Sequence, residues 1–333
     1  MWGESKFGEM TRSLHALMET EQGAVKGRPA SAPVIRVDDL HMSYGPFAAV
    51  RGISFEVRSG EILAFLGPNG AGKTTTLEIL EGFRRRTSGS VSVLGEDPGT
   101  AGAEWRARIG VVLQESEPES ELTVRECLSL YAGYYPKPRA VDETLELVGL
   151  RDKRDVRCGR LSGGLRRRLD VGLALIGDPA LVFLDEPTTG FDPSARRNAW
   201  EVVANLRTLG KTILLTTHYM DEAEYLADWI VVVAGGRVVA EGTSATLGGR
   251  DSALTVIRFA LPPGTQVDQL PRGIGSQVSA LPGNRVEVRS SEPLQSLGRL
   301  SAWAASEQLE LSDLEVGRPR LEDIYLELTK GST

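Results

Sequence analysis

Short apolar runs, separated by stretches with helical spacing, recur between residues 34 and 245. Two of them, Val34–Leu40 and Ile53–Val57, alternate apolar and polar positions, as strands of an antiparallel edge sheet do. Further strands are predicted at Glu61–Leu66, Ser90–Leu94, Arg108–Leu113, Leu181–Asp185, Thr212–Thr216 and Trp229–Val233. Because helical stretches lie between most of these strands, we predict an α/β domain with a parallel sheet wrapped on both faces.

The spacing is mostly helical between about residues 115 and 178, which predicts a helical subdomain within this domain. Its helices are expected at Thr123–Ala132, Ala140–Val148 and Gly164–Leu175, with Gly and Pro residues between them.

The pattern changes after Gly242, and a small C-terminal α+β domain is expected over residues 250–333. Its predicted strands are Leu254–Ala260, Arg285–Arg289 and Leu309–Val316, and its predicted helices are Leu294–Gln308 and Leu321–Leu328. At the other end, residues 1–33 finish in a Pro/Ala/Ser-rich stretch and are predicted to be a flexible N-terminal extension.

The composition of the 333-residue chain, 41% hydrophobic and 25% charged, is that of a soluble globular protein. Its net charge of −7 argues against a nucleic-acid binder, which needs a basic face. Cys127 and Cys158 lack the spacing of a metal or redox site, so buried thiols in a reducing compartment are expected. No apolar run approaches the ~18 residues that span a bilayer, so any membrane part is expected on another chain.

The segment after the strand Glu61–Leu66 has the phosphate-binding pattern G-x-x-x-x-G-K-[ST]. Its residues are Gly67, Pro68, Asn69, Gly70, Ala71, Gly72, Lys73 and Thr74. Glycines let successive backbone N–H groups point at phosphate oxygens, and the next helix adds the positive end of its dipole. Lys73 can reach the outer phosphates, and the Thr74 hydroxyl can bind Mg²⁺. In this strand–loop–helix context, the pattern predicts a nucleoside triphosphate site.

Two carboxylates end another apolar strand, Val182–Leu184 followed by Asp185 and Glu186. A strand tip beside the phosphate loop is the expected place for a Mg²⁺-binding Asp, so Asp185 is predicted to hold the metal, through water. Glu186 points differently and is predicted to accept a proton from the attacking water, or to orient it.

The tetrapeptide Leu161–Gly164 precedes a predicted helix and lies between the phosphate loop and the two carboxylates. Ser162 suits a helix N-cap, and the N–H groups of Gly163 and Gly164 can approach a phosphate. An ordinary helix cap would look the same, and only the order of the motifs favours the phosphate-binding interpretation.

In this order, the motifs resemble those of the ATP-binding subunits of ABC transporters over roughly residues 34–245. The resemblance implies a P-loop NTPase fold with ATP and Mg²⁺ as ligands. It makes Tyr44 the aromatic that stacks on adenine, and it makes Thr75 a further phosphate contact.

The same resemblance assigns residues around the γ-phosphate. Gln114 matches the glutamine that contacts Mg²⁺ or water, Asp192 falls with Phe191 on the D-loop, and His218 matches the switch histidine. Two positions depart from the family pattern: Leu165 stands where the signature motif usually continues with Gln, and Phe191 stands where Leu is common. The first removes one polar contact, and the second exchanges one apolar residue for another.

Partners also follow from the resemblance. Two copies are expected to pair head to tail, so that Ser162, Gly163 and Gly164 of one copy complete the ATP site of the other. The segment 115–160 is expected to dock an integral membrane subunit, which places the chain at the cytoplasmic face of the cell membrane. No nucleic-acid partner is expected.

Two further segments, Glu186–Pro193 and Leu321–Thr329, resemble the drug-resistance exporter group that includes daunorubicin-type transporters. In that group the ATPase is a separate chain beside an ABC-2-type membrane protein, and a C-terminal domain supports assembly or regulation. The expected function is to power export of a small molecule: a drug, an antibiotic or a lipid-like compound.

Two alternatives remain open from the residues. An importer ATPase would carry the same motifs. A soluble ABC ATPase acting on ribosomes or DNA is disfavoured, because the chain has one ATP cassette and no heptad run between Lys73 and Asp185.

Overall fold

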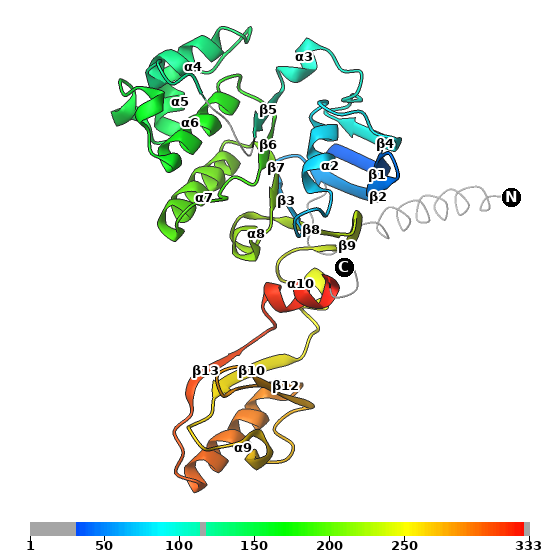
Figure 1. Ribbon diagram of the computed structural model, residues 1–333, viewed down its shortest axis with the longest axis vertical. Coiled ribbons are helices and arrows are strands. Elements are labelled where there is room, and N and C mark those ends of the chain that lie inside the picture. The colour runs from blue at the N-terminus through cyan, green and yellow to red at the C-terminus, as the bar shows by residue number, and fades with distance from the viewer. Residues whose placement is uncertain (1–30, 114–117, 330–333) are drawn as a thin grey trace, which may run out of the picture. The chain divides into compact units, whose positions relative to one another are not determined.

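The computed structural model describes residues 31–113 and 118–329, and the chain divides into two compact units, Met1–Val238 and Val239–Thr333 (Figure 1). The predicted N-terminal extension lies, up to residue 30, outside the described residues, and so does Gln114. The first strand, β1, begins at Pro33.

A six-stranded sheet forms the centre of the first unit, in the order β5-β6-β7-β3-β8-β9. Its strands are β3 (Ile62–Leu66), β5 (Ile109–Val112), β6 (Leu181–Asp185), β7 (Thr212–Thr217), β8 (Trp229–Ala234) and β9 (Arg237–Gly242). Strand β3 pairs in parallel with β7 and β8, and β6 pairs in parallel with β5 and β7. Because neighbouring parallel strands end at the same edge of a sheet, the segments that follow β6, β7 and β3 lie side by side.

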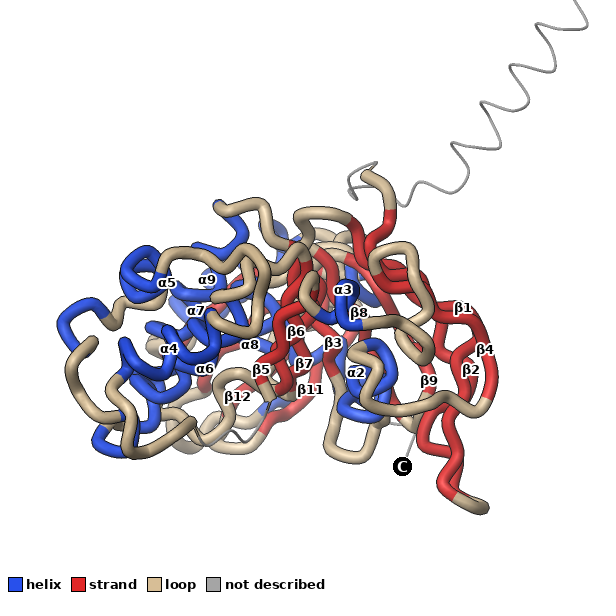
Figure 2. The backbone as a smooth tube through the Cα atoms, turned by 90° about the horizontal axis from the view of Figure 1, so that it is seen from above, coloured by secondary structure: helices blue, strands red, loops and turns tan. Residues whose placement is uncertain are grey.

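Helices cover both faces of this sheet, which explains why every residue of β3, β6, β7 and β8 is buried. Helices α6 and α7 lie on one side of the strands and α2 on the other (Figures 1 and 2). The helices of the unit are α2 (Lys73–Leu80), α3 (Ala103–Arg106), α4 (Val124–Ala132), α5 (Val141–Leu147), α6 (Gly163–Leu175), α7 (Pro193–Thr208) and α8 (Met220–Leu226).

A three-stranded antiparallel sheet, in the order β2-β1-β4, flanks the phosphate loop. Its strands are β1 (Pro33–Tyr44), β2 (Phe47–Arg58) and β4 (Ser88–Val93). Alternate residues such as Ile35 and Val37 are buried and share one hydrophobic core with Phe65 and Phe183 of the parallel sheet. Helix α2 contacts strands of both sheets and so fixes the phosphate loop between them.

The predicted helical segment is present as α4, α5 and α6, which gather in one part of the unit (Figure 1). Helix α4 begins with a capping box, in which Thr123 and Glu126 bond each other's backbone N–H groups. The α/β class, the antiparallel edge sheet and this helical segment are therefore as the sequence predicts. Among the described residues, no helix is both long enough and apolar enough to cross a membrane.

The second unit contains an antiparallel sheet in the order β11-β12-β10-β13. Its elements are β10 (Thr255–Ala260), β11 (Gln277–Leu281), β12 (Arg285–Ser290), α9 (Pro293–Ser306), β13 (Ser312–Gly317) and α10 (Leu321–Thr329). One sheet face packs under α9, and the core there includes Ile257, Phe259, Val288 and Leu300. Strand β11 of this small α+β unit was not predicted from the sequence, and neither was β9, most of which falls within the same unit.

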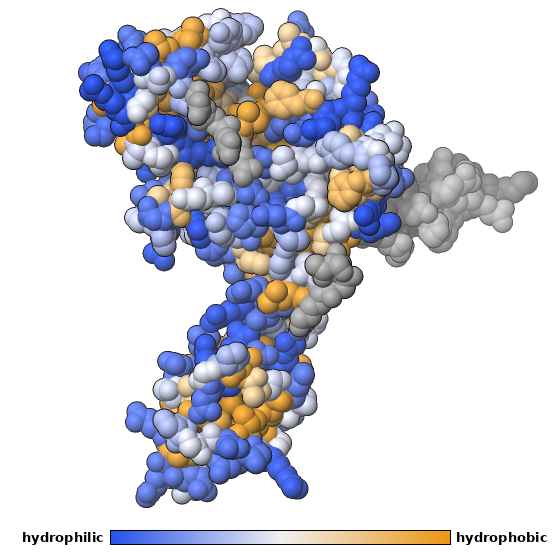
Figure 3. All heavy atoms as spheres, viewed as in Figure 1, coloured by the Kyte–Doolittle hydropathy of each residue, from blue (hydrophilic) through white to orange (hydrophobic). Residues whose placement is uncertain are grey.

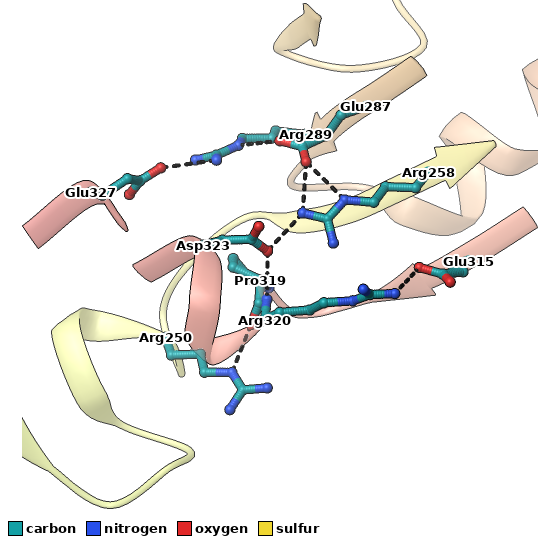
Figure 4. Close-up of polar contacts among 9 residues, drawn as sticks. All are labelled: Arg250, Arg258, Glu287, Arg289, Glu315, Pro319, Arg320, Asp323 and Glu327. Atoms are coloured by element: carbon teal, nitrogen blue, oxygen red, sulfur yellow. Dashed lines mark hydrogen bonds and ion pairs between the residues drawn. The ribbon is translucent and has the colours of Figure 1, made fainter. Parts of the chain in front are cut away.

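Ion pairs join α10 to the sheet of the second unit (Figure 4). Arg258 on β10 contacts Glu287 at 2.8 Å and Asp323 of α10 at 2.6 Å. Arg289 on β12 contacts Glu327 of α10 at 2.9 Å. Charged side chains thus anchor the last helix to this sheet.

In the first unit, the face seen in Figure 3 is mostly hydrophilic, with scattered hydrophobic groups.

Candidate functional site

The phosphate loop runs from the end of β3 to the start of α2, and its geometry requires glycine at two positions. A Cβ atom on Gly67 would lie 2.3 Å from the Val233 carbonyl oxygen, which no side chain can tolerate. Gly72 precedes α2 with φ of 96°, a left-handed conformation that favours glycine. Lys73 is buried beneath the loop, and its Nζ donates to the carbonyl oxygens of Gly67 at 2.9 Å and Pro68 at 3.3 Å.

The predicted carboxylates lie beside this loop, because β6, β7 and β3 are neighbours in the sheet. Asp185 is paired in register with Thr216 of β7, whose hydroxyl donates to Asp185 Oδ1 at 2.5 Å. The same hydroxyl accepts from the Glu186 backbone N–H at 3.0 Å. Burial raises the pKa of Asp185 above its ordinary value, although hydrogen bonds from Thr216 and Thr74 oppose the shift.

Glu186 follows β6 with φ of 44°, which only a few non-glycine residues adopt. Its carboxylate lies 3.3 Å from Lys73 Nζ and 3.2 Å from His218 Nδ1, and it accepts a hydrogen bond of 3.0 Å from the Thr189 hydroxyl. Burial opposes the charged form, but Lys73, Thr189 and His218 together outweigh it and lower the pKa of Glu186. At neutral pH this carboxylate is ionised and able to accept a proton.

These side chains share one cavity of about 540 Å³. It is lined by Tyr44, Phe47, Ala49, Asn69, Gly70, Gly72, Lys73, Thr74, Thr75, Glu186, Thr189 and His218. Nine of these were predicted from the sequence, whereas Phe47, Ala49 and Thr189 were not. Phe47 could have been found, because the turn dipeptide Gly45-Pro46 separates it from Tyr44 and places the two residues opposite each other.

Tyr44 ends β1 at the mouth of this cavity, with 40% of its surface exposed. Its hydroxyl lies 3.4 Å from the Thr75 hydroxyl, and the Arg84 guanidinium lies 5.1 Å from its ring centroid. A cation at this distance from a ring is held by the π-system and leaves other ring surface open for stacking.

The tetrapeptide around Ser162 lies in a different cavity of about 500 Å³, between α6 and α7. Ser162 is the N-cap of α6, but its side chain makes no capping hydrogen bond, so the hydroxyl stays open to a ligand. Asp192 caps α7 and accepts from the N–H groups of Ser194 and Ala195. The chain by itself therefore does not bring Ser162, Gly163, Gly164 and Asp192 to the phosphate loop.

A buried carboxylate of α8, Glu222, connects segments around the site. It accepts hydrogen bonds from the Thr188 hydroxyl at 2.7 Å and from Trp200 Nε1 at 3.0 Å. Burial raises its pKa, while hydrogen bonds from Thr217, Thr188 and Trp200 oppose the shift. The sequence offered no local pattern for this residue.

The residues present suit Mg²⁺ bound together with nucleotide phosphates. Thr74 lines the cavity and Asp185 ends β6 close by, and Thr74 acts to lower the pKa of Asp185, so two oxygen donors lie next to the phosphate loop. Magnesium is usually held by one or two such protein oxygens, with substrate phosphates and waters supplying the rest. Among the described residues, no cluster of three or more His, Cys, Asp or Glu side chains is placed to hold a metal ion.

Known proteins share both units of the chain. Residues 50–189 match the family model described as ABC transporter, and residues 255–319 match that of an ABC transporter domain-containing protein-like C-terminal domain. A relative from Burkholderia lata, named Nod factor export ATP-binding protein I, is 38% identical over 306 residues, covering 89% of this chain and 98% of the relative. The chain belongs to the ABC transporter ATP-binding family.

Other ABC proteins agree with this assignment. A relative of the same name from Neorhizobium galegae is 45% identical over 266 residues, covering 74% of this chain and 76% of the relative. Among solved structures, the ADP conformation of MJ1267, an ATP-binding cassette of an ABC transporter, has a TM-score of 0.58 and 27% identity. That match covers 64% of this chain and 92% of the cassette. The protein is a transport ATPase of the ABC type, and domains of this type bind ATP and ADP.

Proposed function

We propose that this ABC ATPase powers the export of a small molecule through a separate membrane subunit of the ABC-2 type. The observation that carries the proposal is the likeness to relatives named for Nod factor export, because it extends over both units of the chain. The names specify Nod factor for those proteins. For this chain we propose a wider cargo class: a drug, an antibiotic or a lipid-like compound.

The geometry supports a hydrolytic role for the cavity residues. The loop N–H groups and Lys73 bind the β- and γ-phosphates, and Tyr44 stacks on the adenine. Glu186 takes the proton of the attacking water while the water oxygen bonds to the γ-phosphorus and the bond to the ADP oxygen breaks. His218, within contact of Glu186, donates to a γ-phosphate oxygen. When bound, Mg²⁺ neutralises charge on the phosphates, and Asp185 and Thr74 would hold it.

A second copy of the chain completes the site. Ser162, Gly163 and Gly164 surround a cavity of their own, away from the phosphate loop, and the Ser162 side chain makes no capping bond. A head-to-tail homodimer would give these groups a phosphate to bind and would make ATP part of the interface. Loss of the γ-phosphate would then loosen the pair, as in other switches ordered by one phosphate.

We place the dimer at the cytoplasmic face of the membrane, with residues 115–160 against the membrane subunit. The predicted Gln114 contact to Mg²⁺ or water would link that surface to the nucleotide.

The test is reconstitution with a candidate membrane protein of the ABC-2 type. Inside-out vesicles containing both proteins should accumulate a candidate cargo when ATP is added outside, and the cargo should stimulate ATP turnover. Vesicles in which Glu186→Gln replaces the wild type serve as the matched control. Cargo movement in the opposite direction would indicate an importer. Co-purification with ribosomes and no membrane partner would contradict the proposal.

A further inference from the structure

Arg167 is a buried cation whose contacts lie between two motifs of the site. It is on the second turn of α6, the helix that begins directly after Ser162, and only 8% of its surface is exposed. Its guanidinium donates to three backbone carbonyl oxygens. These are Asp185 at 2.9 Å, Pro187 at 3.1 Å and Leu113.

Two of these carbonyls flank Glu186. The left-handed backbone of Glu186, with φ of 44°, is a strained conformation that the surroundings must hold. Arg167 holds the carbonyl on each side, and Thr216 accepts from the Glu186 N–H at 3.0 Å. Three hydrogen bonds therefore fix the short segment from which the Glu186 carboxylate extends toward Lys73 and His218.

The residue type matters for this arrangement. Burial lowers the pKa of Arg167, and the nearest carboxylate of its own helix, Asp170, is 3.9 Å away. A buried cation is tolerated only if its donors are used, and a guanidinium offers five donors in a planar fork. A lysine side chain has a single nitrogen, so it cannot take the places of the three separate atoms, Nε, Nη1 and Nη2, that donate to the three carbonyls.

We propose that Arg167 is a positioning residue, which sets the Glu186 carboxylate for water activation and makes its position depend on the helix that carries Ser162. The contact with Leu113 extends the same fork to the last described residue before position 114. A movement of α6 thereby reaches the base directly, through one side chain. The inference rests on the proposed role of Glu186 as the base.

The first test compares Arg167→Lys with wild type in the full-length protein. The dissociation constant for ATP and the KM should stay within about twofold, because the phosphate loop is untouched. The kcat should fall by about tenfold or more, because small displacements of catalytic groups cost that much or more. Arg167→Gln, which removes the charge as well, should show the same split if the lysine variant is poorly soluble.

The matched control is Arg250→Lys. Arg250, in the second unit, also donates to two backbone carbonyls, those of Pro319 and Ser244, both at 2.7 Å. This variant should have a lower melting temperature than the wild type and the same kcat. A kcat for Arg167→Lys within twofold of wild type, or a loss that only follows the folded fraction, would overturn the proposal.

A double-mutant cycle separates positioning from general support. With Glu186→Gln already present, adding Arg167→Lys should leave the residual turnover unchanged, since Arg167 acts through Glu186. Multiplicative losses would show that Arg167 acts independently and would also overturn the proposal. If Glu186→Gln itself turns over at the wild-type rate, the assignment of the base fails first, and the single variants distinguish this case.

Discussion

His218 Nδ1 lies 3.2 Å from Glu186 Oε2, although the two residues are separated along the chain by α7 and β7. The contact exists because β6 and β7 are parallel neighbours that end at one sheet edge. A histidine at this place can hydrogen-bond a γ-phosphate oxygen and contact the Glu186 carboxylate with the same ring. In the proposed roles of these residues, loss of the phosphate would therefore change the surroundings of Glu186 directly.

Replacement of Glu186 by Gln should separate ATP binding from hydrolysis. The amide keeps the size of the side chain but cannot take the proton, so kcat should fall by about 10²–10⁴-fold while ATP still binds. With ATP present, the variant should accumulate as a dimer, measurable by light scattering after size-exclusion chromatography. Turnover at the wild-type rate would show that another group is the base.

Tyr44 should contribute to ATP affinity through its ring and not through its hydroxyl. Tyr44→Ala removes the stacking surface and should weaken ATP binding by about 1–3 kcal/mol, the usual value for one base on an aromatic ring. Tyr44→Phe, which loses only the 3.4 Å contact with Thr75, should bind as wild type. Titration of both variants with a fluorescent ATP analogue checks this, and equal losses would assign the effect to the hydroxyl.

Glu81 should make the stability of the fold depend on pH. Burial, with smaller repulsions from Asp185 and Glu78, raises its pKa from 4.5 to about 8. Between these values the folded chain binds a proton that the unfolded chain releases. The contribution is therefore full below the unfolded pKa and is lost as the pH rises through the folded pKa.

The non-ionising variant Glu81→Gln provides the measurement. At about pH 5 its melting temperature should equal that of the wild type. At about pH 8.5 it should melt at a higher temperature, with a free energy of unfolding larger by about 2–4 kcal/mol. Because both proteins share every other titrating group, the difference isolates Glu81. A difference that does not change between the two pH values would contradict the shifted pKa.

Removal of residues 250–333 should leave ATP binding intact and weaken assembly. This truncation keeps all of β9, an edge strand of the sheet that carries the phosphate loop. A shorter chain ending at Val238 lacks most of β9 and should melt at a lower temperature. Calorimetric ATP binding and the dimer fraction of each truncation check the expectation. Loss of ATP binding in the longer truncation would show that the second unit is required for the site.

The parts of the site that follow from short sequence patterns are the loop from Gly67 to Thr74 and the two carboxylates at the end of β6, Asp185 and Glu186. Each of these parts consists of consecutive residues, so a short pattern is enough to recognise it. Helix α2 begins at Lys73, as the phosphate-binding pattern predicts. The supporting contacts of Thr216 and Arg167 could not be predicted in this way. They depend on which strands are neighbours and on the register between them, which no local pattern specifies.

The fold shows the same division. The buried strands β3, β5, β6, β7 and β8 lie close to their predicted bounds, whereas β1 and β2 are longer than predicted and β9 was not predicted. Strand β11 was missed because it is a five-residue strand at a sheet edge, and none of its residues is buried. The positive φ of Glu186 was equally hidden, since it is imposed by hydrogen bonds from distant residues.

The buried carboxylate Glu222 has a mechanical consequence. It ties Thr188, two residues after the base, to Trp200 in α7 and sits on the helix that follows His218. The loop after β6 and the loop after β7 are therefore linked through the hydrogen bonds of one side chain. A displacement of the loop after β7 would therefore be passed to the loop after β6 and to α7, a helix that also lines the cavity around Ser162.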